Sequence, residues 1–506
     1  MSSQASYEFT LPDLPIQAIL DDIADTVALT RRCVISAPPG AGKSTLVPLR
    51  LLNEPRVGGR IVVLEPRRVA ARAVAQRMAD LTNTPLGALI GYRTRDDAVM
   101  SDSARIEVVT EGILTRRLQH DPELPGIGAL IFDEVHERNL MTDIGLAFSL
   151  DVGSTLRPDL AICAMSATAD TDRMSRLLDG AKVLSCDGRQ FHVDLQWRPM
   201  SSNRRNARPP SLNELISALT GVVVESLAAD DGDLLVFLPG IGEINRLRDA
   251  LSNVVGGNIT IHRLAGSISR DEQDAALRRE HGMRSIILAT DIAETSLTVD
   301  GVGVVIDSGL VRSPRFDSRT GMTRLTTIAT SRSSAEQRAG RAGRTGPGVA
   351  YRMWSKVEHG SRLAFPEPEI NSVELSNFAL EIAKWGGDLS ALRLPTQPSA
   401  ASMKAARNLL HTLGAINDEG LTAIGEQMLR LPIHPRLSRM LLGQPTATAC
   451  AVAALLDEGD IALGRPDDRP ADLTERIEAL IDLSNNNLQV DRNRLRRVHQ
   501  RSEDLA

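Results

Sequence analysis

The sequence has few aromatic residues and no long hydrophobic run. Phe, Trp and Tyr make up 3% of its 506 residues, and no segment reaches the roughly 18 consecutive apolar residues that a membrane span needs. The first 30 residues contain acidic and alternating apolar positions instead of a basic stretch followed by an apolar core, so we expect no secretion signal there. We therefore expect a soluble, cytoplasmic protein that does not bind a membrane.

Cysteine is also scarce, and the four cysteines are scattered along the chain at Cys33, Cys163, Cys186 and Cys450. No two of them are close in sequence, which excludes a disulfide framework and the paired spacing of a zinc site. Two of the four lie in strand-like apolar runs, where we expect buried thiols.

Basic charge is limited in amount and in kind. The net charge of −6 argues against indiscriminate binding to polyanions, so any nucleic-acid partner has to be held by a local groove. Only five of the 58 basic residues are lysines, and Lys43 is the only lysine among the first 181 residues. A compact, flexible ammonium group therefore has a specific task at this position.

Lys43 belongs to a loop of small residues at 37–44, Ala-Pro-Pro-Gly-Ala-Gly-Lys-Ser, which follows a strand-like run at 33–35. Such a loop turns backbone N–H groups toward nucleotide phosphates, its lysine reaches the terminal phosphates, and the hydroxyl of Ser44 can hold Mg²⁺. Ala37 departs from the usual pattern, which has glycine there. The alternative is a glycine-rich turn before an ordinary helix, and the Gly-Lys-Ser ending favours phosphate binding.

Short apolar runs alternate with helix-like stretches in the first half of the chain, at 61–64, 106–109, 130–132 and 162–165. This alternation is typical of a parallel sheet with helices on both faces. The pattern breaks at a polar stretch, 198–210, and resumes at 234–238, 286–288 and 304–306, which predicts a second α/β domain. After about Glu367 the chain becomes helix-rich, and its basic run at 492–497 is typical of a solvated helix face.

Two carboxylates and an imidazole, Asp133, Glu134 and His136, follow the apolar run at 130–132. This order places them at the carboxyl edge of the sheet, where the loop of Lys43 also opens. Asp133 would orient the Mg²⁺ shell, and Glu134 would polarise the water that attacks the terminal phosphorus. By themselves, such acidic residues could simply stabilise a helix start, but the phosphate loop upstream favours the catalytic interpretation.

His136 is either a satisfied polar residue or a coupling group. Ser166 and Thr168 end the next strand-like run and place hydroxyl groups at the same sheet edge. We expect His136, Ser166 and Thr168 to couple the nucleotide site to domain movement.

The second α/β domain contains an arginine-rich string at 337–344, Gln-Arg-Ala-Gly-Arg-Ala-Gly-Arg. Its three-residue spacing predicts arginines on one helical face. A guanidinium that arrives from a second domain would stabilise transition-state charge and make hydrolysis depend on domain closure. The alternative is a solvated helix face, which the glycines disfavour.

These strings, in this order, resemble the DEAH-type superfamily 2 helicases, and most closely the bacterial HrpB-like ATP-dependent RNA helicases. Further matching strings lie nearly end to end along the chain, at 66–71, 110–112, 264–267, 290–296 and 434–437. His136 and the Glu-Thr-Ser string at 294–296 are typical of the DEAH group and not of the DEAD-box group.

The resemblance implies an α/β fold with two tandem RecA-like domains built on parallel sheets, followed by a mostly helical winged-helix and ratchet-like region. The expected boundaries are 1–187 and 188–357 for the two RecA-like domains, 358–430 for the winged-helix-like part and 431–506 for the ratchet-like part. HrpB-like relatives continue further, so we expect the ratchet-like part to be incomplete, in either a truncated chain or a naturally short member.

The resemblance also implies that ATP and Mg²⁺ are clamped between the two RecA-like domains. The positions that match catalytic ones are Lys43, Asp133, Glu134, Gln337, Arg341 and Arg344, and Ser44, Asp133 and Glu134 match those around Mg²⁺. The positions that match nucleotide-binding ones are Pro39, Gly40, Ala41, Gly42, Lys43, Ser44 and Thr45, with Arg77 at the base and Asp300 at the ribose. Leu277 stands where many relatives stack an aromatic on the base, so we expect loose base selectivity.

Single-stranded RNA is implied to cross both domains, with movement in the 3′ to 5′ direction. The positions that match nucleic-acid contacts are Arg67, Arg68, Thr110, Gly266 and Thr290. The segment 312–326 looks like the hairpin that wedges strands apart in the family, and its alternative is a surface hairpin.

We therefore expect a monomeric RNA-stimulated ATPase that separates duplexes or remodels RNA–protein complexes; the sequence names no protein partner. Two alternatives stay open. One is an ATP-dependent RNA clamp without processive unwinding. The other is a DNA-directed motor, since phosphate contacts carry no sugar information.

Overall fold

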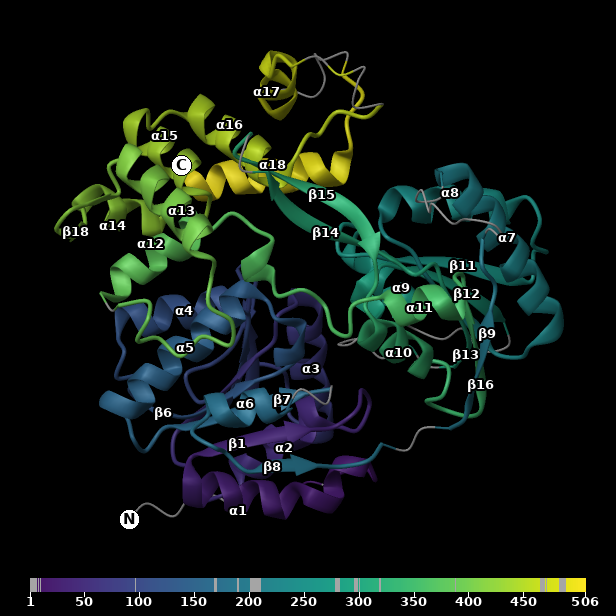
Figure 1. Ribbon diagram of the computed structural model, residues 1–506, viewed down its shortest axis with the longest axis horizontal. Helices are drawn as coiled ribbons and strands as arrows, with labels where there is room; N and C mark the ends of the chain where they lie inside the picture. Colours follow the sequence, from purple (N-terminus) through teal and green to yellow (C-terminus); the bar gives the residue numbers. More distant parts are fainter. Residues whose placement is uncertain are drawn as a thin grey trace. The chain divides into compact units, whose positions relative to one another are not determined.

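The computed structural model describes most of the chain, namely residues 7, 9, 11–95, 97–167, 171–188, 191–200, 211–277, 283–294, 299, 301–317, 320–386, 388–464, 469, 471–481 and 488–506. Its internal contacts divide the chain into two units (Figure 1). The first unit comprises Met1–Val373 with Leu392–Gln397, and the second comprises Glu374–Ala391 with Pro398–Ala506. The sequence predicted four parts with boundaries at residues 187, 357 and 430, and these boundaries stay a prediction.

The first α/β domain is built on an eight-stranded sheet in the order β4-β3-β5-β2-β6-β7-β1-β8. All neighbouring strands are parallel except β3 and β4. The strand bounds are β1 Arg32–Ser36, β2 Arg60–Leu64, β3 Ile90–Arg93, β4 Ala98–Val99, β5 Ile106–Val109, β6 Ile127–Phe132, β7 Ala161–Ser166 and β8 Val183–Ser185. The structure confirms the parallel sheet and each of the strands predicted for this half of the chain.

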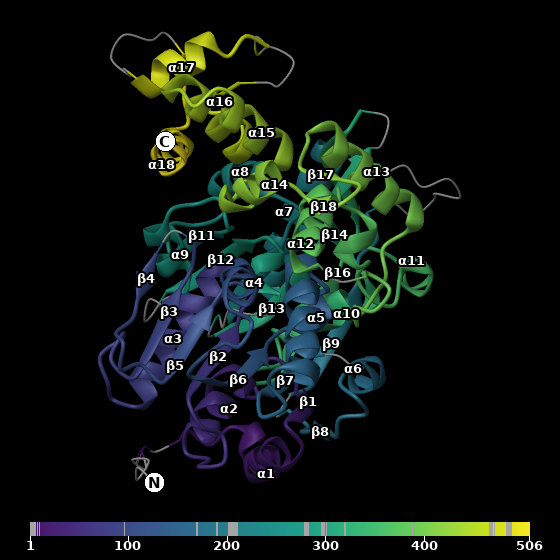
Figure 2. The ribbon, with the colours of Figure 1, turned by 90° about the vertical axis from the view of Figure 1, so that its left-hand side faces the viewer.

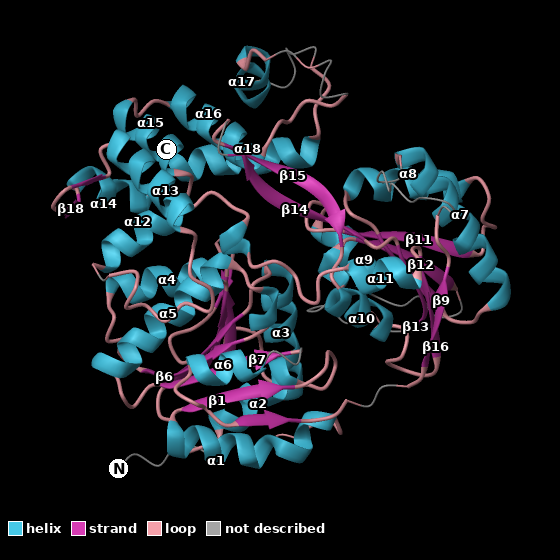
Figure 3. Ribbon diagram, viewed as in Figure 1, coloured by secondary structure: helices cyan, strands magenta, loops and turns pink. Residues whose placement is uncertain are grey.

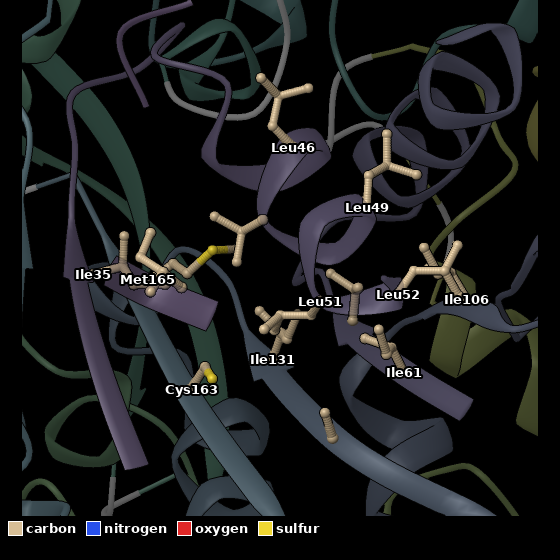
Figure 4. Close-up of a cluster of buried hydrophobic side chains, with 14 of the residues drawn as sticks. Ile35, Leu46, Leu49, Leu51, Leu52, Ile61, Ile106, Ile131, Cys163 and Met165 are labelled. Carbon is tan, nitrogen blue, oxygen red and sulfur yellow. The ribbon is translucent and has the colours of Figure 1, made fainter. Parts of the chain in front are cut away.

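The helices of this domain are η1 Pro15–Ile19, α1 Leu20–Thr30, α2 Lys43–Leu52, α3 Arg68–Leu81, α4 Glu111–His120, η2 Val135–Glu137, α5 Leu140–Thr155 and α6 Thr171–Leu177. Apolar side chains of α1, α2 and α3 share a core with β1, β2, β6 and β7, part of which is drawn in Figure 4. Cys33 and Cys163 are buried in this core, as their apolar runs predicted. Burial of apolar surface on this face of the sheet is the main force that holds α1 and α2 against the strands.

The second α/β domain has a six-stranded, fully parallel sheet in the order β11-β12-β10-β13-β16-β9. Its strands are β9 Val193–Trp197, β10 Asp233–Phe237, β11 Ile259–Leu264, β12 Arg284–Ala289, β13 Val302–Asp307 and β16 Gly348–Arg352. Its helices are α7 Leu212–Ala229, α8 Ile241–Ser252, α9 Arg270–Leu277, η3 Asp291–Ala293, α10 Arg332–Gly340 and α11 Lys356–Ser361. Figure 3 shows both sheets in magenta with helices packed around them. The predicted second α/β domain is therefore confirmed.

The start of the second domain includes one long apolar helix and part of the polar stretch at 198–210. Helix α7 is long and apolar enough to cross a membrane by length and composition, but it packs several of its side chains in the core around the second sheet. Within the polar stretch expected to separate the domains, residues 201–210 lie outside the described residues.

A long antiparallel hairpin leaves the second domain between β13 and α10. It consists of β14 Leu310–Asp317 and β15 Met322–Ala329, which pair from Leu310 with Ala329 to Asp317 with Met322. The hairpin predicted at 312–326 is thus confirmed, although residues 318 and 319 of its turn lie outside the described residues.

The second unit is mostly helical, as predicted. It contains α12 Ser376–Trp385, α13 Ala400–Thr412, α14 Ala423–Arg430, α15 Pro435–Gly443, α16 Ala447–Glu458, α17 Thr474–Ile481 and α18 Arg492–Leu505, and η4 Glu369–Asn371 precedes it in the first unit. A small hairpin of β17 Ile416–Asn417 and β18 Gly420–Leu421 follows α13. In α18, Arg492 and Arg496 are exposed as expected, whereas Arg494 donates to the carbonyl oxygen of Asp460 at 2.6 Å.

Glu111, the first residue of α4, is expected to make the free energy of unfolding of the first domain depend on pH. Burial, then the charges of Glu369 and Glu137, raise its pKa to about 7 from an ordinary value of 4.5, although Arg68 opposes the shift. The folded state therefore keeps a proton that the unfolded state releases, so this group lowers stability as pH rises from 4.5 to 7. The pKa difference corresponds to about 3 kcal/mol at most.

We expect Glu111→Gln to raise the Tm relative to the unmodified chain at pH 8 and to leave it nearly unchanged at pH 4.5. The amide resembles the protonated carboxyl group but never acquires the buried charge. Thermal unfolding at the two pH values checks this, with the exposed Glu123→Gln as the control. An equal effect of Glu111→Gln at both pH values would contradict the assignment.

Candidate functional site

The loop between β1 and α2 has the shape that its small residues predict. Gly40 and Gly42 have φ angles of 85° and 94°, in the left-handed region that favours glycine. A Cβ atom on Gly42 would lie 2.8 Å from Cδ1 of Leu14. Ala37, where the usual pattern has glycine, does not have a positive φ and donates its N–H to the carbonyl oxygen of Ser166 at 3.1 Å. Alanine is therefore accommodated, and the loop leads directly into the N-terminus of α2.

Lys43 begins α2, and its ammonium group is buried against two carboxylates from the end of β6. Its Nζ lies 2.8 Å from Oε1 of Glu134 and 3.6 Å from Oδ1 of Asp133. Burial alone would lower the pKa of Lys43, but the charges of Asp133 and Glu134 outweigh burial and raise it. The lysine therefore stays charged.

Glu134 is held as an ionised carboxylate. Burial would raise its pKa, but the charges of Lys43 and His136 bring it below the ordinary value. Its backbone adopts a left-handed conformation with φ 51°, which is strained for a residue with a side chain. A strained, charged and buried carboxylate at the edge of a sheet fits the part of a catalytic base.

Sequence reasoning missed Glu65, which lies directly after β2. Its side chain is buried, and burial, then the charges of Asp133 and Glu134, raise its pKa well above the ordinary value. Among the three carboxyl side chains of this group, Glu65 is therefore the one that most readily keeps a proton. Glu65 follows β2 at the carboxyl edge of the sheet just as Asp133 follows β6, so its position in the sequence already carried the signal.

The oxygens around Lys43 fit a divalent cation of the Mg²⁺ type. Burial raises the pKa of Asp133, while the charge of Lys43 and the Ser44 hydroxyl oppose the shift, and one buried oxygen each of Asp133 and Glu134 has no hydrogen-bond partner. Among the described residues, no three His, Cys, Asp or Glu side chains form a ready-made metal cluster. Mg²⁺ usually binds to one or two carboxylates together with substrate phosphates, and it does not need a closed protein cage.

His136 connects the carboxylates to the next strand. Its Nδ1 lies 3.4 Å from Oε2 of Glu134 and accepts the N–H of Ala167 at 3.3 Å. Ser166 is buried at the end of β7, whereas Thr168 lies outside the described residues. A direct link between the site and β7 therefore exists at His136, and the coupling role of the three residues stays a prediction.

The arginine string at 337–344 differs from the expected single helical face. Helix α10 ends at Gly340, and Arg344 lies in the turns that follow. A Cβ atom on Gly343 would lie 2.7 Å from the carbonyl oxygen of Phe191, so close backbone packing requires glycine three residues beyond the end of the helix. The expectation of one helical face was therefore wrong. The solvated alternative is also wrong for Arg338 and Arg341, which are only 1% and 3% exposed.

Glu294 holds two of these arginines and was missed as a functional residue. Its Oε2 accepts Nε of Arg338 at 2.9 Å, and its carbonyl oxygen accepts Nε of Arg341 at 2.9 Å. Arg338 also donates to Asp307 at 2.9 Å and lies over the ring of Phe237. Burial, followed by the charge of Arg344, lowers the pKa of Arg341. Arg338 thus forms structural ion pairs with Glu294 and Asp307, and these hold Glu294, whose carbonyl oxygen positions Arg341.

A cavity of about 460 Å³ is lined by residues of both α/β domains, which belong to the same unit. Lys43, Asp133 and Glu134 are not among its lining residues. The predicted residues among its lining are Pro39, Gln337, Arg341 and Arg344. A Cβ atom on Gly40 would lie 3.7 Å from Cζ of Arg344, so this guanidinium lies over the phosphate loop. Arg77 is exposed on α3, and Asp300 lies outside the described residues, so the base and ribose contacts stay predictions.

The residues predicted to contact nucleic acid share a position in the two sheets. Arg67 and Arg68 follow β2 and Thr110 follows its neighbour β5, which lie side by side in Figure 2. Gly266 and Thr290 follow the paired strands β11 and β12 in the same way. All five therefore lie at carboxyl ends of neighbouring strands, where ligands of such sheets bind. Leu277 is partly buried against the core of the second domain.

Comparisons with known proteins agree with this architecture. Residues 16–177 match the DEAD/DEAH box helicase family, 213–346 match the helicase conserved C-terminal domain, and 406–433 match the winged-helix helicase associated domain (HA2). The chain is similar to a crystal structure of the Escherichia coli DEAH/RHA helicase HrpB, with a TM-score of 0.84 and 38% identity over 97% of this chain and 60% of that one.

Curated relatives include two ATP-dependent RNA helicases of Escherichia coli. HrpB is 42% identical over 88% of this chain and 55% of its own length, and HrpA is 34% identical over 92% of this chain and 36% of its own length. The chain thus spans about half the length of HrpB and about a third of the length of HrpA. The matches cover both sheets, the candidate site and part of the helical region in order, so the chain contains the DEAD/DEAH box helicase domain and the helicase conserved C-terminal domain and resembles HrpB.

Proposed function

We propose that this chain is an ATP-dependent RNA helicase that hydrolyses ATP with Mg²⁺, moves 3′ to 5′ on single-stranded RNA, and separates duplexes or remodels RNA–protein complexes. The observation that carries the proposal is the cavity where the phosphate loop of one α/β domain faces Gln337, Arg341 and Arg344 of the other. The similarity to RNA helicases supports RNA as the nucleic acid. We further propose that the protein acts as a monomer in the cytoplasm.

The phosphates of ATP would displace Glu134 from Lys43. The ammonium group is 2.8 Å from this carboxylate, and incoming phosphate oxygens would offer it a competing set of negative charges. Backbone N–H groups of the loop and the N-terminus of α2 add to the attraction for phosphate. Mg²⁺, held by Ser44, Asp133 and Glu134, would neutralise phosphate charge when bound. ATP binding therefore frees the catalytic base as it fills the site.

Glu134 would then accept a proton from the attacking water, which Gln337 would position. Oε1 of Gln337 is buried without a hydrogen-bond partner and lines the cavity, which fits a group that waits for a water or a phosphate. Arg341 and Arg344 would stabilise the charge that develops on the transferred phosphoryl group. Because these three side chains come from the second domain, hydrolysis depends on the approach of the two domains.

The proposal predicts that single-stranded RNA strongly stimulates ATP hydrolysis by the 506-residue chain. Phosphate release with and without RNA measures this, and Lys43→Ala controls for contaminating ATPases because it removes the ammonium that binds the phosphates. An equal rate of phosphate release with and without RNA, or no ATP hydrolysis at all, would contradict the proposal for this chain.

Strand displacement then separates the helicase from the alternatives. Displacement of duplexes with a 3′ overhang, and not of those with a 5′ overhang, supports translocation in the proposed direction. RNA-stimulated hydrolysis without displacement would instead identify an RNA clamp. Competition between matched RNA and DNA single strands at one salt concentration distinguishes an RNA motor from a DNA motor.

A further inference from the structure

Arg67, which is predicted to contact nucleic acid, forms ion pairs with two carboxylates of the protein, Glu137 and Asp291. Its Nε donates to Oε2 of Glu137 at 3.4 Å, and its Nη2 lies 3.3 Å from Oε1 of Glu137 and 3.2 Å from Oδ2 of Asp291. Nε and one Nη form the edge of a guanidinium that binds carboxylates or phosphates in a bidentate manner. The edge that would hold a backbone phosphate is therefore filled by side chains of the protein.

The two carboxylates come from different α/β domains of the first unit. Glu137 ends η2, directly after the segment of Asp133 to His136, and Asp291 begins η3 in the second domain. Asp291 directly follows Thr290, another predicted nucleic-acid contact. Arg67 thus joins the two domains through an ion pair at the place where nucleic acid is expected.

The two partners differ in how easily they can leave Arg67. The side chain of Glu137 is 17% exposed, whereas that of Asp291 is 45% exposed. Asp291 therefore loses less on separation, because solvent can hydrate its carboxylate. The same three side chains line a cavity of about 290 Å³ together with His136, Glu294 and Gln337, which belong to the nucleotide site or position it.

We propose that Asp291 holds Arg67 in the absence of nucleic acid, and that a backbone phosphate of single-stranded RNA displaces Asp291 from it. The inference rests on the proposed function, because RNA is the ligand. Asp291 acts as an internal competitor, so RNA binding breaks an ion pair between the two domains and leaves them able to rearrange around the nucleotide. Glu137 stays beside Arg67 and keeps its guanidinium in place.

The test is RNA affinity measured with the full chain in the absence of nucleotide. Binding of a fluorescent uridine 12-mer is followed by anisotropy at one salt concentration. Asp291→Asn keeps the shape of the side chain and removes its charge, so we expect it to lower the Kd roughly fivefold, in the range given by a partly exposed ion pair. Arg67→Ala is expected to weaken binding.

A matched control is available in the same domain pair. Nη2 of Arg72 on α3 pairs with Oδ1 of Asp274 on α9 at 3.3 Å, so Asp274→Asn also removes an ion pair between the two domains but leaves Arg67 untouched. We expect Asp274→Asn to leave the Kd unchanged. In the Arg67→Ala background, Asp291→Asn is expected to have no further effect, because the two side chains act as a pair.

Three results would overturn the inference while the proposed function stands. These are an unchanged or higher Kd with Asp291→Asn, an equal gain with Asp274→Asn, and a gain from Asp291→Asn that persists without Arg67. The second would indicate that loosened domains bind RNA better, and the third that Asp291 repels RNA directly. If the unmodified chain does not bind the RNA at all, the inference and the proposed function both fail. A thermal melt of each variant confirms that it is folded.

Discussion

Replacing Glu134 with glutamine is expected to leave ATP binding intact and to abolish turnover. The amide keeps the size of the side chain but cannot accept the proton of the attacking water, and loss of a general base lowers rates by roughly 10²- to 10⁴-fold. Loss of the 2.8 Å ion pair also leaves Lys43 more available to phosphates. Binding of a fluorescent ATP analogue and phosphate release at saturating ATP and RNA measure the two effects.

Glu65→Gln provides the matched comparison for Glu134→Gln. Both side chains are buried glutamates in the same group of carboxyl side chains, but the raised pKa of Glu65 means that glutamine replaces a neutral group there. We expect Glu65→Gln to change turnover much less than Glu134→Gln. Normal turnover in Glu134→Gln, or a reversed order of the two variants, would show that Glu134 is not the base.

From the role proposed for Arg341, replacing it with alanine is expected to reduce hydrolysis by about 10³-fold or more, which is the effect of removing an arginine finger. The guanidinium is buried and its Nε donates to the carbonyl oxygen of Glu294, so it points into the cavity with its position fixed. A positive charge that is fixed before the reaction stabilises the transition state without further reorganisation. The kcat at saturating ATP and RNA measures the effect.

Arg332→Ala is the control for Arg341→Ala. Arg332 begins α10 and lines the same cavity, but its side chain is exposed, so its charge is screened by water. We expect at most a small change in kcat. A mild effect of Arg341→Ala would assign the transition-state charge to Arg344 or another group, and a thermal melt would show whether loss of the buried guanidinium has unfolded the second domain.

Local patterns predicted the two sheets well. Short apolar runs such as 61–64 and 286–288 became strands because parallel strands buried on both faces need continuous apolar sequence. The loop of Lys43 and the residues after β6 were located for a related reason, since both follow a strand end at the ligand-binding edge. The arginine string was located correctly but given the wrong local structure, because the packing of Gly343 against Phe191 lies outside any local pattern.

The sequence by itself determined the order of elements, the phosphate loop and the identities of the candidate catalytic groups, because these depend on residue types within a few positions of one another. Only the tertiary structure decided how these groups are paired and charged. Lys43 meets Glu134 across 91 positions, and Arg67 meets Asp291 across 224. Whether Glu65 keeps its proton and whether Arg67 is occupied depend on burial and on charges within a few ångströms, which exist only once the distant segments have packed together.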